Sequence, residues 1–275
     1  LLVLSPGAEP VRPPLPGIAS PGIFTLRNVA DTDLIKGYVK QKHVKKAVVV
    51  GAGFIGLEMA ENLAGLGLEV SIVEMGNQVM APLDYPMAAL VQQHIRSHGM
   101  QLLLDTAVSA FENTGNGLKV LLKDGDVLEA DVVILSIGVR PDTRLAVDAG
   151  LETGPARGIR VNEFLQTSDP DIYAVGDAIE FENPITGRSM NTYLAGPANK
   201  QGRICADNIV LGNKHPYSGA INTAIVKVFD MTVATAGMAS KHLSSAGIAH
   251  IVSTTHSGAH AGYYPGSRQM SIQVA

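Results

Sequence analysis

The stretch VVVGAGFIGLEMAENLAGLGLEVSIVE, residues 48–74, constrains the fold more than any other part of the chain. An apolar run leads into three glycines spaced as G-x-G-x-x-G, followed by a helical segment and a second apolar run that ends in Glu74. This order predicts a strand, a tight turn, a helix and a second strand. Such a unit binds dinucleotides in doubly wound α/β sheets.

Each glycine of the motif has a separate physical role. Gly51 permits the tight turn, Gly53 lets the backbone approach a pyrophosphate, and Gly56 lets the helix lie close to the sheet. We include Phe54 and Ile55 with the cofactor-binding residues, because the first N–H groups and the dipole of the helix attract an anion. A purely structural glycine turn is the alternative, since the bare motif also arises by chance.

Two acids accompany the glycine turn. Glu74, at the end of the second strand, is placed to accept both hydroxyls of an adenosine ribose and to repel a 2′-phosphate. We therefore expect NADH rather than NADPH, with a solvated acid at the start of a loop as the alternative. Glu58 lies two residues past Gly56, near the expected cofactor, and is a candidate catalytic residue.

Length and charge exclude several classes of protein. A chain of 275 residues exceeds the usual size of one undivided core, so two or three domains are expected. No apolar run approaches the roughly 18 residues of a membrane helix, and a net charge of −4 without a basic run argues against nucleic acid. The single cysteine, Cys205, excludes an internal disulfide framework and makes a reducing, cytoplasmic setting the default.

Four motifs in a fixed order resemble those of the pyridine nucleotide-disulfide oxidoreductases: VVVGAGFIGLEMAENL, SIGVRPDT, TSDPDIYAVGDA and LAGPANKQGRICADNI. The nearest resemblance is to the coenzyme A-disulfide reductase, persulfide reductase and NADH oxidase branch. It implies an α/β fold in which a Rossmann-like NADH domain with a meander, residues 34–150, is inserted in a partial FAD domain, residues 1–33 and 151–216. A partial α+β dimerisation domain, residues 217–275, would follow.

The resemblance also implies where the flavin lies. The family binds the ADP part of FAD with a first glycine motif, which is absent here, so the chain is expected to be a fragment that lacks this motif and the redox cysteine. Gly176 and Asp177 match the motif whose acid binds a hydroxyl of FAD, although an aspartate that caps a turn is the alternative. Gly138 resembles the turn beside the nicotinamide, and Arg140 is expected to be a solvated or domain-bridging charge rather than a catalyst.

A helix expected to begin at Pro197 would direct its positive end at the pyrimidine edge of a flavin, with Ala198 among the backbone donors. An ordinary capped amphipathic helix is the alternative. Cys205 lies in the middle of this helix among apolar neighbours, so we expect a buried, inert thiol. It does not match the redox cysteine of the family.

Tyr263 and Tyr264 resemble tyrosines that reach toward the partner subunit's active site, and ordinary aromatic packing is an equal alternative. His256 and His260 are four residues apart, but their segment is too rich in Gly and Ser to be a helix. We therefore assign no metal site to the sequence.

The sequence thus predicts the central portion of an FAD-dependent enzyme. It would pass a hydride from NADH to flavin and on to a disulfide or persulfide such as coenzyme A disulfide, as a homodimer, and the fragment alone is expected to be inactive. An NADH oxidase or peroxidase is one alternative, and a non-catalytic NADH-binding fragment is another.

Overall fold

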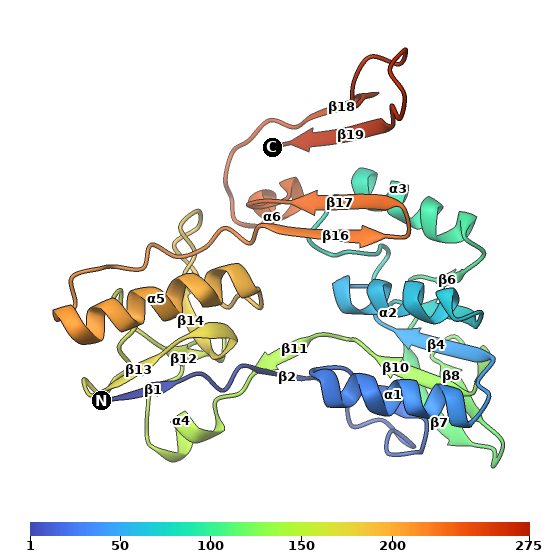
Figure 1. Cartoon of the computed structure of the whole chain (residues 1–275), viewed down its shortest axis with the longest axis horizontal. Coiled ribbons are helices and arrows are strands. Elements are labelled where there is room, and N and C mark those ends of the chain that lie inside the picture. The colour runs from blue at the N-terminus through green and yellow to red at the C-terminus, as the bar shows by residue number, and fades with distance from the viewer.

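The structure, a computed structural model, describes residues 1–275. Its centre is a five-stranded parallel sheet (Figure 1) with the strand order β3 (Ile23–Thr25), β10 (Val132–Leu135), β4 (Lys46–Val50), β5 (Glu69–Val73) and β6 (Gln101–Leu103). All neighbours in this sheet run in the same direction, so helices must cross over between them. The α/β class predicted from the glycine-rich stretch is confirmed.

Three helices belong to this unit, and a reciprocal cap fixes the start of the first one. They are α1 (Val29–Gln41), α2 (Phe54–Gly65) and α3 (Tyr85–Ser97). Asn28 caps α1 by accepting a hydrogen bond from the N–H of Asp31 at 3.1 Å, while the Asp31 carboxylate accepts one from the Asn28 N–H at 3.1 Å. This reciprocal pair satisfies two otherwise free N–H groups and fixes the start of the helix.

The central strands are apolar without alternation because both faces of the sheet are covered. Val49 packs into a core with α2 and α3, where Leu57 and Val91 are buried. Val48, on the opposite face, packs against a different core that contains Phe111 and Val120. Successive side chains of a strand point to opposite faces, so such a strand must be apolar throughout.

The face of the central sheet opposite α2 and α3 is covered by an antiparallel meander. Its strands are β7 (Val108–Asn113), β8 (Leu118–Leu122) and β9 (Val127–Ala130). The turn between β8 and β9 contains Gly125, with φ of +98°, a conformation that glycine adopts without strain. The dipeptide Asp124–Gly125 between two apolar runs predicts a hairpin turn from the sequence, and the structure forms that hairpin between β8 and β9.

A second unit unites the first residues of the chain with residues 144–217. Strand β1 (Leu2–Leu4) pairs in parallel with β13 (Ile172–Ala174), and α5 (Ala195–Leu211) lies beside them (Figure 1). The remaining elements of the unit are α4 (Arg144–Asp148), β12 (Ile159–Arg160), the 3-10 turn η1 (Gly176–Ala178), β14 (Ile179–Glu182) and β15 (Ser189–Met190). The sequence predicts a unit boundary near residue 34, whereas β3 already belongs to the central sheet, because it forms the ladder with β10.

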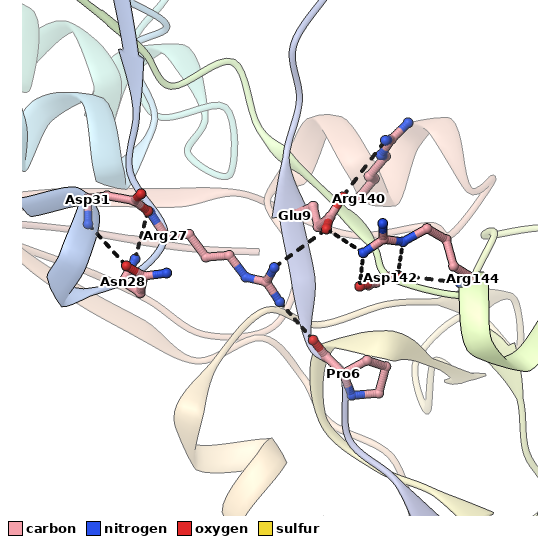
Figure 2. A network of polar contacts seen from close by, with 8 residues as sticks. All are labelled: Pro6, Glu9, Arg27, Asn28, Asp31, Arg140, Asp142 and Arg144. Carbon is pink, nitrogen blue, oxygen red and sulfur yellow. Dashed lines mark hydrogen bonds and ion pairs between the residues drawn. The ribbon is translucent and has the colours of Figure 1, made fainter. Parts of the chain in front are cut away.

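Two strands connect the units and pair with each other. They are β2 (Ala8–Pro10) and β11 (Val139–Pro141), which run antiparallel. Glu9 of β2 lies among three arginines (Figure 2), at 3.0 Å from Arg144, 3.6 Å from Arg27 and 3.9 Å from Arg140. Arg140 is exposed and lies near Glu9 between the two units, which agrees with the expectation of a solvated or domain-bridging charge.

The C-terminal residues form β16 (Ala224–Val228), β17 (Met231–Thr235), α6 (Ser240–Ser245), β18 (Ser253–Gly258) and β19 (Gln269–Val274). The β16–β17 hairpin lies over α2 (Figure 1), and the N–H of Phe229 at its turn donates to the Glu61 carboxylate of α2 at 2.8 Å. The β18–β19 hairpin extends away from the rest of the chain. None of the helices has the length and apolar character needed to cross a bilayer.

We predict that Glu9→Gln lowers the free energy of unfolding by about 0.5–1 kcal/mol in low salt, because three arginines lose a shared carboxylate. Urea denaturation checks this value, and the difference should shrink as salt screens the charges. Glu129→Gln is the matched control, since Glu129 pairs only with Lys46 and is exposed. An equal loss in both variants would contradict a special role for the Glu9 network.

Candidate functional site at the junction of the two units

One cavity of about 940 Å³ reaches from the glycine turn to the N-terminus of α5. We call it the shared cavity, because residues of the central sheet unit and of the α5 unit both line it. The sequence-predicted residues that line it are Gly51, Gly53, Phe54, Ile55, Glu58, Glu74, Gly138 and Pro197. The structure therefore brings together residues that lie up to 146 positions apart in the chain, from Gly51 to Pro197.

The three glycines of the motif differ in what surrounds them. Gly51 has φ of +101°, and a Cβ there would collide with the carbonyl oxygen of Ser136. A Cβ on Gly56 would collide with the carbonyl oxygen of Gly51, so the helix lies against the turn. A Cβ on Gly53 would meet no atom within 4 Å. Packing thus requires the first and third glycines, whereas the middle one keeps space open in the cavity.

Ser136 stabilises this turn and was not identified from the sequence. Its hydroxyl lies 2.9 Å from the carbonyl oxygen of Val50 and 3.0 Å from that of Gly51. The two carbonyl oxygens share the one hydrogen that this hydroxyl donates. It therefore joins the end of β10 to the end of β4. Its position directly after an apolar strand is the only sequence signal, and many loop serines share it.

Both helices that begin at the cavity lack a side-chain cap. The N-cap residue of α2 is Gly53 and that of α5 is Leu194, and neither offers an oxygen to the first N–H groups. These groups have no intrahelical acceptor and need another partner. Two uncapped helix N-termini at one cavity can hold negatively charged groups, since N–H groups and helix dipole act together.

The start of α5 differs from the sequence prediction. The helix begins at Ala195 rather than Pro197, so the proline occupies the third position, where its missing N–H costs nothing. The Ala198 N–H donates within the helix to Leu194 at 3.2 Å and is therefore not a free donor as expected. The free N–H groups at this end are those of Ala195 and Gly196, and both residues line the shared cavity.

Glu74 lies at the rim of the glycine turn. One carboxylate oxygen accepts from the Ala52 N–H at 2.8 Å and the other from the Gly76 N–H at 2.8 Å. These bonds fix the carboxylate across the turn and leave acceptor capacity on each oxygen. Glu74 also borders a neighbouring cavity of about 660 Å³. Ribose binding by Glu74 stays a prediction.

Gly176 and Asp177 lie in η1, directly after β13, and neither lines the shared cavity. Burial raises the pKa of the Asp177 carboxyl. Burial, and then the nearby Asp177 charge, raise the pKa of Tyr193, which does line the cavity. A half-buried carboxyl beside a tyrosine hydroxyl offers a polar group where the units meet.

A buried glutamine holds this segment in place. The side chain of Gln201, with 0% exposure, accepts from the Gly176 N–H at 2.7 Å and donates to the Tyr217 hydroxyl at 3.0 Å. Gln201 therefore connects α5 to η1. The signal for this contact in the sequence is an amide on the inner face of a helix.

Other candidates lie outside the site. Tyr263 and Tyr264 are exposed between β18 and β19, with ring centroids 5.0 Å apart, and do not reach the shared cavity.

Cys205 is buried in the core of the α5 unit, and burial raises the pKa of its thiol. The expected burial of this cysteine is confirmed. The residues His256 and His260 are not helical, also as expected.

Comparison with known proteins identifies similar chains. Residues 1–202 match the family model described as pyridine nucleotide-disulphide oxidoreductase. The chain is 35% identical to an NADH oxidase of Methanocaldococcus jannaschii over 99% of this chain and 60% of the relative. This chain therefore spans less than two thirds of that relative's length.

Two solved structures have nearly the same fold. One is reduced CoADR-RHD of Bacillus anthracis, with a TM-score of 0.96 and 48% identity over 99% of this chain and 49% of that chain. The other is an NAD-dependent persulfide reductase from A. fulgidus, with a TM-score of 0.95 and 37% identity over 99% of this chain and 50% of that chain.

We predict opposite effects for alanine at two glycines of one turn. Gly56→Ala should lower the free energy of unfolding by about 1–3 kcal/mol or more, because the new methyl group meets a backbone carbonyl that cannot rotate away. Gly53→Ala should be neutral or stabilise by about 0.4–1 kcal/mol, since its φ of −80° suits alanine and the space is open. Chemical denaturation of both variants measures this, and equal destabilisation would refute the distinction.

Proposed function

The chain belongs to the pyridine nucleotide-disulphide oxidoreductase family, and on this premise we propose that it is the central portion of an FAD-dependent oxidoreductase. The enzyme passes a hydride from NADH to flavin and then electrons to a disulfide or persulfide such as coenzyme A disulfide. The observation that supports this most directly is the shared cavity, in which the glycine turn and the N-terminus of α5 open into one space.

That arrangement suits a two-electron relay. Hydride transfer needs the two reacting rings in contact, and a single continuous cavity between the two units permits this. When bound, NADH supplies the hydride and FAD accepts it. The chain's residues supply binding, orientation and electrostatic stabilisation.

The glycine turn holds the NADH side. The open space at Gly53 admits a pyrophosphate against the uncapped N-terminus of α2. Glu74 accepts the ribose hydroxyls, and Gly138, with φ of +108°, keeps the backbone clear of the nicotinamide end. Glu58 on α2 lines the same space and can orient the nicotinamide.

The α5 unit holds the flavin side. The N–H groups of Ala195 and Gly196 stabilise negative charge on a reduced flavin at the end of a 17-residue helix. Asp177 follows Gly176, whose N–H donates a hydrogen bond to the Gln201 side chain, and it is positioned to accept a hydrogen bond from a hydroxyl of FAD. Pro197 lines the cavity and keeps the helix start rigid.

The sulfur step requires a thiolate that this chain does not offer. Cys205 is 2% exposed and its pKa is raised by burial, whereas a redox cysteine needs an accessible thiolate. We propose that the redox cysteine lies in the part of the protein that this chain does not span. An NADH oxidase is the alternative, favoured by the name of the Methanocaldococcus jannaschii relative.

We further propose that the protein is a homodimer through residues 217–275 and that it acts in the cytoplasm. Apolar side chains on the β18–β19 hairpin, among them Met270, Ile272 and Val274, are exposed in the single chain and would be covered by a second copy. A single cysteine suits a reducing compartment.

Cofactor binding by the purified chain tests the proposal. The chain is incubated with FAD, separated by gel filtration and examined for visible flavin absorbance, and NADH binding is measured by calorimetry. We expect NADH binding that Gly53→Ala weakens. A chain that binds neither cofactor would overturn the proposal. Disulfide reduction that disappears in Cys205→Ser would overturn the placement of the redox cysteine.

We predict that Glu74→Gln weakens NADH binding by about 1–3 kcal/mol, the range for a hydrogen bond to a charged group. The unmodified chain should prefer NADH to NADPH. Glu69→Gln is the control, because Glu69 is exposed at the opposite end of β5. Calorimetry with both nucleotides checks the prediction, and tighter NADPH binding by the unmodified chain would contradict the role of Glu74.

A further inference from the structure

Two histidines and an aspartate converge where the C-terminal hairpin meets α3. His94 lies in the last turn of α3, His98 is its C-cap residue, and Asp230 lies in the turn between β16 and β17. One ligand atom from each residue can be chosen so that all three lie within 4.8 Å of one another. The cluster is separate from the shared cavity, whose lining contains none of these residues.

The spacing and the contacts of His98 hold it in place. Residues four apart on a helix lie on the same face, and the two imidazole centroids are 4.5 Å apart. Nδ1 of His98 lies 2.9 Å from the carbonyl oxygen of His94. A carbonyl can only accept, so Nδ1 donates the hydrogen, and in the neutral ring Nε2 then carries the lone pair that a metal ion needs.

Phe229 further fixes this ring. Its side chain stacks on His98 with centroids 3.9 Å apart and planes within 8°. Phe229 is held in turn by its N–H bond to the Glu61 carboxylate at 2.8 Å. Such supporting contacts orient metal-binding histidines and are costly to remove.

His94 leaves a polar atom that needs a partner. Its Nε2 is buried, and it makes no hydrogen bond of acceptable geometry although Asp230 Oδ1 lies 3.0 Å away. Buried polar atoms are rarely left in this state. A cation would satisfy both the His94 nitrogen, with its lone pair, and the Asp230 carboxylate oxygen 3.0 Å away.

We propose that His94, His98 and Asp230 bind a divalent transition-metal ion of the Zn²⁺ type. Two imidazole nitrogens and one carboxylate oxygen are a typical ligand set for such an ion, and water completes the coordination. The ion links α3 to the β16–β17 turn and so fastens the β16–β17 hairpin to the central sheet unit. This role does not depend on the proposed redox function.

The test uses the complete chain without a polyhistidine tag, stripped of metal by a chelator and dialysed against Zn²⁺. Elemental analysis gives the zinc content, calorimetry gives the affinity, and thermal melting gives the effect on stability. Asp230→Asn keeps the size of an exposed side chain, and His98→Phe keeps the stacking on Phe229. His256→Phe is the matched control, because His256 is exposed on β18 and lies outside the cluster.

We expect one Zn²⁺ per chain and a melting temperature that rises with Zn²⁺. Asp230→Asn and His98→Phe should weaken binding by more than about 100-fold, since losing even a group that supports a ligand costs roughly 10–100-fold. The control should behave like the unmodified chain. Absence of stoichiometric zinc in the unmodified chain, or cluster variants that bind Zn²⁺ as tightly as the unmodified chain, would show a simple histidine–aspartate ion pair and overturn the proposal.

Discussion

The close approach of the glycine turn to the end of β10 is the constraint on which the site depends. Gly51 lies against the carbonyl of Ser136, and Gly56 lies against the carbonyl of Gly51. The Ser136 hydroxyl bonds to both Val50 and Gly51 and closes the contact. Because no side chain fits here, the N-terminus of α2 and the chain that leaves β10 meet at the carboxyl ends of the parallel strands. In open parallel sheets, ligands bind at these carboxyl ends.

The two connecting strands extend this geometry to the second unit. Strands β2 and β11 pair with each other between the two units, and Glu9 of β2 lies near Arg27, Arg140 and Arg144 (Figure 2). Beyond these strands, β1 and β13 lead into Gly176, and Gln201 fastens that segment to α5. The shared cavity therefore lies between the two units, with an uncapped helix N-terminus on each side.

Side chains of the sheet unit also position the C-terminal hairpin. Glu61 accepts from the backbone of Phe229, and Asp84 accepts from the backbone N–H groups of Ser240 and Lys241 at 2.8 and 3.0 Å. His94 adds the contact with Asp230. Acids that would pass for solvated surface charges in the sequence are thus used to dock another part of the chain. This explains why the proposed metal site lies at the same junction.

The sequence alone determined the local structure of this protein. Glycine spacing, continuous apolar strands and the Asp124–Gly125 turn specified the sheet, the crossover helices and the meander, because backbone freedom and burial are properties of short segments. Tertiary structure decided what depends on distant partners. Helix α5 begins at Ala195 rather than at Pro197, so its free N–H donors differ from those expected. The partners of Gln201 and His94 come from other elements, and no spacing in the chain reveals a contact that folding creates between segments far apart.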